Sequence, residues 1–67
     1  MGIDLPVGLA MKLARSDEGT KNFAALSDDD QAAIVSYIQQ SVTGADAKKR
    51  IGDAFTGIEH GDLSFLS

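Results

Sequence analysis

Residues 27–42, SDDDQAAIVSYIQQSV, decide the fold, because they carry both a helix start signal and a helical apolar stripe. Ser27 is followed three residues later by the carboxylate of Asp30, and this spacing has the form of a capping box. Apolar side chains then recur at the spacing of one helical face, at Ile34, Val35, Ile38 and Val42, with Tyr37 beside them. The stretch predicts a helix over about residues 28–42.

Similar helix start signals appear upstream, where two shorter helices are expected. Pro6 suits the first turn of a helix, because its missing N–H would have no partner there. Apolar residues follow on one helical face at Leu9, Ala10, Leu13 and Ala14. Ser16 then offers a second cap, and acidic residues after it are placed favourably against the helix dipole. We expect helices over about residues 6–15 and 17–26.

Downstream, Thr43 and Asp46 repeat the capping pattern and predict a helix over about residues 44–60. Its apolar residues recur at spacings of three and four: Ala47, Ile51, Ala54, Phe55 and Ile58. Gly61 suits the end of this helix, because glycine adopts the left-handed C-cap conformation without a steric penalty. Residues 62–67 follow as a C-terminal tail.

These elements predict an all-α fold, a compact bundle of three to four short helices with a C-terminal tail. The 67 residues form one small domain at most. Elsewhere the sequence has no strand-like alternation of useful length. Because connections of one to three residues join the helices, successive helices are expected to be spatial neighbours.

Net charge and amino-acid composition exclude or disfavour several classes of function. The net charge of −4 disfavours nucleic acid and anionic membranes, since binding to either draws on a basic surface. No run approaches the ~20 apolar residues that span a bilayer, and the start of the chain lacks the features of a signal peptide. With no cysteine, a disulfide framework and a Cys-based zinc site are both excluded. We expect a cytoplasmic protein that does not associate with membranes.

The tail carries the first candidate binding residues, Leu63, Phe65 and Leu66. If exposed, they would form an apolar patch that requires a partner. If folded back, they would complete a thin core, and burying each is worth ~1.5–3 kcal/mol. The second alternative is favoured, because a domain this small has few other apolar side chains to bury.

Lys48, Lys49 and Arg50 form the only basic cluster. They could contact a phosphate, a nucleic acid or an acidic partner. As consecutive helical residues they span most of a turn rather than one face. The favoured interpretation is therefore a solvated surface, with Arg50 pairing with Asp46 or Asp53 at three- or four-residue spacing.

The sequence gives little support to an enzyme. His60 is the single histidine, and no second metal ligand or nucleophile pattern accompanies it, so a hydrolase using His60 is the weakest hypothesis. The acidic run 28–30 would cap a helix rather than bind a cation, because consecutive helical residues point about 100° apart. We predict no enzymatic activity, no cofactor and no metal.

The chain also resembles the C-terminal helical segment of the YdeI/OmpD-associated (bacteriocin-protection) family and short uncharacterised Firmicutes proteins. The matching residues are Pro6, Leu13, Asp17, Phe23, Leu26, Ser27, Tyr37, Ile38, Thr43, Arg50, Ile51, Ala54, Ile58 and Gly61. That segment typically carries F-x-x-L-S, Y-x-x-W-I and T-R-x-R-I stretches. Here the tryptophan is absent, and Gly44 stands where the first arginine would be. The resemblance implies a bacterial helical module loosely associated with envelope stress, and it implies no catalytic residues.

Two functional hypotheses from different classes follow. The first is a non-catalytic protein-interaction module that binds an unknown protein partner, or itself, through an apolar groove between helices or through the tail. The alternative is a weak nucleic-acid or phosphate-ligand binder centred on Lys48, Lys49 and Arg50, which the acidic net charge makes less favoured.

Overall fold

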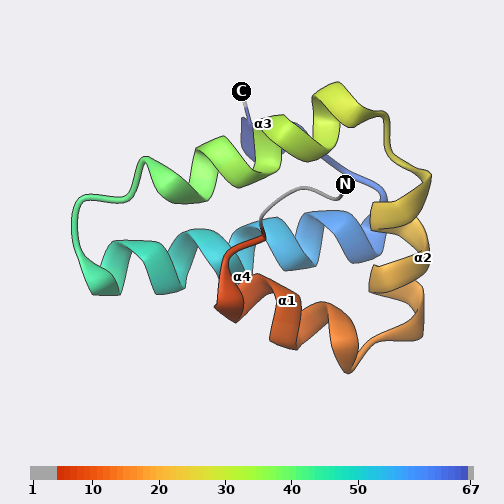
Figure 1. The fold of residues 1–67 in the computed structure, drawn as a ribbon, viewed down its shortest axis with the longest axis horizontal. Coiled ribbons are helices and arrows are strands. Elements are labelled where there is room, and N and C mark those ends of the chain that lie inside the picture. The colour runs from red at the N-terminus through yellow and green to blue at the C-terminus, as the bar shows by residue number, and fades with distance from the viewer. Residues whose placement is uncertain (1–4, 67) are drawn as a thin grey trace.

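The computed structural model describes residues 5–66 and has an all-α fold, as the sequence predicts (Figure 1). Its helices are α1 (Val7–Ala14), α2 (Asp17–Ala25), α3 (Asp28–Gln39), α4 (Gly44–His60) and the short 3-10 helix η1 (Ser64–Leu66). The long α4 lies at the centre, with α1 and α3 on opposite sides and α2 joining them at one end (Figure 1). No strand occurs in this part of the chain.

The predicted caps set the helix starts. The side chains of Ser16, Ser27 and Thr43 each accept a hydrogen bond from the backbone N–H three residues later, at 3.0 to 3.1 Å. These bonds satisfy N–H groups that have no partner within the helix. Predicted and observed starts agree to within one residue in all four helices, α1 beginning at Val7 rather than at Pro6.

The end of α3 differs from the prediction. The helix ends at Gln39 instead of residue 42, and Val42 is 89% exposed instead of joining the apolar stripe. The cause is Ser41, whose backbone N–H and side-chain hydroxyl both donate to the carbonyl of Ile38. A short polar side chain that bonds to a nearby carbonyl competes with helix propagation. The chain then turns toward the cap at Thr43.

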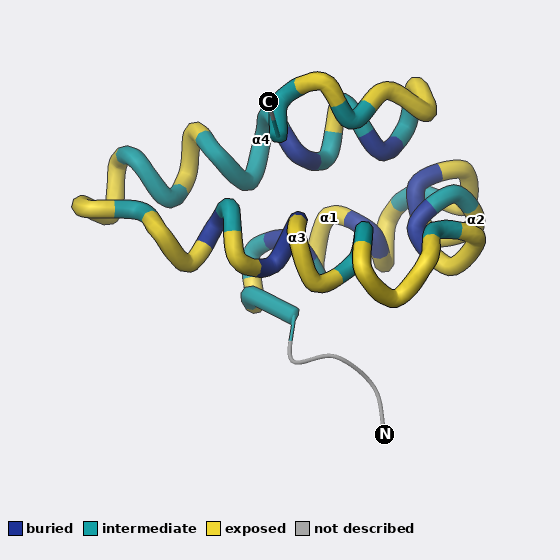
Figure 2. Tube along the Cα trace, turned by 90° about the horizontal axis from the view of Figure 1, so that it is seen from above, coloured by how far each residue is buried: buried dark blue, intermediate teal, exposed yellow. Residues whose placement is uncertain are grey.

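The core lies between the facing sides of the four main helices. Its buried cluster comprises Leu9, Leu13, Phe23, Ile34, Ile38, Ala54 and Ile58. In Figure 2 the buried stretches of the trace lie on the inner sides of the helices, and exposed stretches cover the outside. Because α4 contacts every other element, its residues Ala54 and Ile58 hold the bundle together.

The C-terminal tail packs onto the bundle, the alternative that the sequence favours. Gly61 ends α4 with a positive φ of 68°, and the N–H of Asp62 donates to the carbonyl of Gly57 at 2.8 Å. This turn brings η1 against α3 and α4, where Leu63, Phe65 and Leu66 become half-buried. These three side chains therefore belong to the fold.

Candidate functional site

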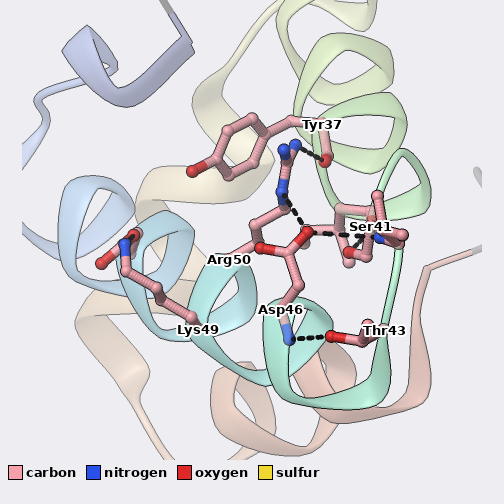
Figure 3. Close-up of polar contacts among 9 residues, drawn as sticks. Tyr37, Ser41, Thr43, Asp46, Lys49 and Arg50 are labelled. Atoms are coloured by element: carbon pink, nitrogen blue, oxygen red, sulfur yellow. Dashed lines mark hydrogen bonds and ion pairs between the residues drawn. The ribbon is translucent and has the colours of Figure 1, made fainter.

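Two members of the basic cluster, Lys49 and Arg50, point toward different partners (Figure 3). Lys49 Nζ lies 3.0 Å from Asp53 Oδ2, and this hydrogen bond and ion pair raise the pKa of Lys49. Arg50 Nε lies 3.3 Å from Asp46 Oδ2, which is one of the two pairings expected for Arg50. Lys48 is exposed, and it is the member of the trio without an ion pair in the described part of the chain.

Arg50, in α4, joins α4 to α3 by contacting Tyr37. Its Nη1 donates to the carbonyl of Tyr37 at 2.7 Å, and its Cζ lies 4.7 Å from the centroid of the Tyr37 ring. Figure 3 shows the guanidinium beside this ring, with dashed lines to the Tyr37 carbonyl and to Asp46. The Tyr37 ring also packs against Phe65 with its centroid 5.2 Å away, in an edge-to-face arrangement. Arg50 thus stabilises the interhelical contact on which the tail rests.

His60 lies at a hollow of about 300 Å³ near the tail. The hollow is lined by Asp53, Thr56, Gly57, His60, Asp62, Ser64 and Phe65. Among residues 5–66 the imidazole makes no hydrogen bond or ion pair, so no base–nucleophile pair is assembled around it. Asp62 instead accepts the backbone N–H of Ser64 at 3.0 Å, and this bond lowers the pKa of the Asp62 carboxyl.

The acidic run 28–30 lies in the first turn of α3, the location expected for residues that offset the helix dipole. Asp30 contributes the backbone N–H that bonds to Ser27 at 3.1 Å. Within residues 5–66 no group of three or more His, Cys, Asp or Glu side chains is arranged to hold a metal ion.

The outer side of α1 carries an apolar surface that was not predicted from the sequence. Val7 and Met11 are 75% and 55% exposed, and Ala14 continues the same side of the helix. The opposite side buries Leu9 and Leu13. The signal was present in the sequence, since VGLAMKLA holds only one charged residue, Lys12. A helix that is apolar on all sides is ordinarily covered on all sides.

A second hollow, of about 340 Å³, adjoins this surface and is lined by Lys12, Arg15, Ser16, Phe55 and Glu59. Lys12 Nζ stands 5.7 Å from the centroid of the Phe55 ring, a distance at which a cation is attracted to the ring face. Ser16 Oγ donates to Glu59 Oε2 at 2.8 Å and so joins the start of α2 to α4. We call Val7, Met11 and Ala14 together with this hollow the α1 surface.

The α1 surface is continuous because of helical spacing. Val7, Met11 and Arg15 follow one another at intervals of four residues, which places them in one line along the outside of α1. Lys12 lies beside that line, toward α4. An apolar strip therefore leads into a hollow with two cations and an aromatic wall.

Comparison of the chain with protein-family models, curated proteins and solved structures returns no match. The resemblance to the YdeI/OmpD-associated family thus stays a prediction based on the residues quoted for it. No helix within residues 5–66 is both long and apolar enough to cross a membrane.

Proposed function

We propose that this protein is a non-catalytic protein-interaction module and that it binds its partner through the α1 surface. The observation that carries the proposal is the exposure of Val7 and Met11 on a helix with a single charged residue. Scattered apolar side chains are normal on protein surfaces, but a strip beside a hollow is typical of a binding site. Val42, the most exposed large apolar side chain described, lies alone in the α3–α4 connection and lacks these neighbours.

The size of the strip indicates a weak, reversible contact. Full burial of a valine or methionine side chain is worth ~1.5–3 kcal/mol, and these two are already partly covered. Association costs an estimated 4–15 kcal/mol in lost freedom of movement. Apolar contact at Val7 and Met11 is therefore insufficient alone, and a partner needs polar contacts as well.

The other surfaces considered from the sequence have less support. Leu63, Phe65 and Leu66 already pack against the bundle, so releasing them would cost stability before any partner gained contact. In the Lys48, Lys49 and Arg50 trio, two members pair with acidic residues of this chain, which weakens the case for a phosphate or nucleic-acid site.

Affinity capture from lysate of the native source tests the proposal. The baits are the intact chain, a Val7→Gln/Met11→Gln variant and a Val42→Gln variant, each checked for an unchanged melting temperature. Glutamine keeps helix propensity while removing apolar surface. We expect a protein that the intact chain and the Val42 variant retain and that the α1 variant loses. Equal retention by all three baits would place the site elsewhere.

A further inference from the structure

We infer that the α1 surface binds an amphipathic helical segment whose apolar side is bordered by carboxylates, an inference that rests on the proposed function. Val7 and Met11 would take the apolar side chains, and the adjoining hollow would take an acidic one between Lys12 and Arg15. The proposal comes from the juxtaposition of the exposed apolar strip with two cations that form no ion pair within residues 5–66.

The cations are available for such a contact within the described residues. In residues 5–66 the ion pairs are Lys49–Asp53 and Arg50–Asp46, so neither Lys12 nor Arg15 pairs with a carboxylate of that range. Lys12 is exposed, and its Nζ lies 5.7 Å from the centroid of the Phe55 ring, which forms one wall of the hollow. Both Lys12 and Arg15 are exposed, so an incoming carboxylate can reach either cation.

The acidic groups nearby leave the hollow positively charged. Glu59 is the one carboxylate that lines it, and Glu59 already accepts the hydroxyl of Ser16. Two cations and one anion give a local charge of +1, in a chain whose net charge is −4. Asp17 and Glu18 occupy the first turn of α2, and neither lies within ion-pair distance of Lys12 or Arg15. This local sign favours an acidic side chain over a basic one.

A second copy of the chain fits this surface less well. The helix α1 contains no acidic residue and Glu59 is the one carboxylate lining the hollow, so pairing two copies through this surface would bring four cations together with only two carboxylates. The strip is also small, since eight residues give a helix only ~12 Å long. A stable dimer interface buries ~1,200–2,000 Å² in total. A foreign helix that contacts α1 over about two turns matches its length and supplies the missing charge.

Synthetic peptides test the chemistry directly. The first probe is a 14-residue helical peptide with leucines on one side and glutamates bordering them, and two matched probes carry glutamine or lysine in place of glutamate. Binding to the intact chain is measured by fluorescence anisotropy at low and physiological salt, and located by amide chemical-shift changes. We expect the glutamate peptide to bind roughly fivefold more tightly than the glutamine peptide, and the lysine peptide least.

Variants separate this inference from the proposed function. The Lys12→Gln/Arg15→Gln variant should bind the glutamate and glutamine peptides equally, whereas Lys49→Gln should keep the preference because Lys49 pairs with Asp53. The Val7→Gln/Met11→Gln variant should bind neither. Peptide binding without a charge preference, or amide chemical-shift changes located away from α1 and Phe55, would overturn the inference of an acidic helical partner and leave the proposed function untouched. Capture that survives Val7→Gln/Met11→Gln would overturn the proposed function, and self-association in sedimentation equilibrium would replace the foreign helix with a second copy.

Discussion

Two glycines in the same helix, Gly52 and Gly57, show how surroundings decide what a residue does. A Cβ at Gly57 would lie 2.6 Å from Phe65 Cε2 and would also press on the backbone carbonyl of Asp62. A Cβ at Gly52 would meet nothing within 4 Å. The absence of a side chain is thus required at Gly57, where the tail approaches, and it is not required for packing at Gly52.

Alanine substitutions at these two positions should have opposite effects on the free energy of unfolding. Gly52→Ala should stabilise the protein by about 0.5–1 kcal/mol, because alanine is the better helix former and restricts the unfolded chain. Gly57→Ala should destabilise it by about 1–3 kcal/mol, because the new methyl group displaces Phe65 and the Asp62 backbone. Urea unfolding followed by circular dichroism measures both, and equal effects would contradict the close packing of the tail.

The Asp62 carboxylate gives the tail a pH dependence. Its hydrogen bond from the Ser64 N–H lowers the pKa of Asp62 below the ordinary value, so folding favours the charged form. This contribution is fully present above pH ~3.9 and is lost as pH falls through the lowered pKa. Titration of the carboxyl carbon by NMR should give an Asp62 midpoint below the ordinary aspartate value, and Ser64→Pro, which lacks the N–H, should raise that midpoint.

At the scale of elements, α3 and α4 are joined by Arg50, and this contact is distinct from a surface ion pair. Arg50 combines a hydrogen bond to the Tyr37 carbonyl, a cation–π contact with the Tyr37 ring and a partly buried ion pair with Asp46. Lys49 and Asp53 are also four residues apart, but the Lys49 side chain is 75% exposed. Solvent and side-chain entropy leave little net energy in exposed pairs.

Removing these two charges should therefore have unequal effects. Arg50→Met keeps the aliphatic stem and should cost about 1–3 kcal/mol through the lost charged hydrogen bond. Lys49→Met should change stability by less than about 0.5 kcal/mol. Thermal unfolding of both variants measures the difference, and similar losses would show that the Tyr37 contacts contribute little.

The two sides of α1 should also behave differently, which separates stability from binding. Leu9 is fully buried, so Leu9→Ala should destabilise the fold by about 2–5 kcal/mol. Val7→Gln and Met11→Gln should each change stability by less than about 0.5 kcal/mol, because these side chains are exposed. Denaturant unfolding tests this, and a large loss at Met11 would show that its side chain serves the core.

At the scale of the whole molecule, local signals predicted the architecture and missed the proposed binding surface. Three hydroxyl caps fixed where α2, α3 and α4 begin, because each side chain reaches a backbone N–H only three residues away. The predicted end of α3 at residue 42 was wrong. Val42 continues the apolar spacing of the sequence, but Ser41 donates hydrogen bonds to the carbonyl of Ile38, and the helix ends before it. Spacing alone could not show that a local polar contact would end the helix.

The candidate site was harder to predict from the sequence, because it depends on contacts between segments that are distant in the chain. Arg15 and Phe55 are separated by 40 positions in the chain and meet at one hollow only after α1 folds onto α4. Likewise, the three consecutive basic residues Lys48, Lys49 and Arg50 form a cluster in the sequence. In the structure, Arg50 bonds to the Tyr37 carbonyl and Lys49 pairs with Asp53. The sequence placed Leu9, Ala10, Leu13 and Ala14 on one apolar face of the first helix. Leu9 and Leu13 are indeed buried, whereas Ala14 is exposed beside Val7 and Met11.

Site-directed photo-crosslinking measures most directly whether the α1 surface is the binding site. A benzophenone amino acid replaces Met11 in one version of the intact chain and Val42 in the other, and both are irradiated in native-source lysate. We expect a protein crosslinked from position 11 and absent from position 42, and excess Val7→Gln/Met11→Gln chain should fail to compete for it. A crosslink of equal strength from both positions, or none from position 11 while other surface positions capture a partner, would contradict a binding site on α1.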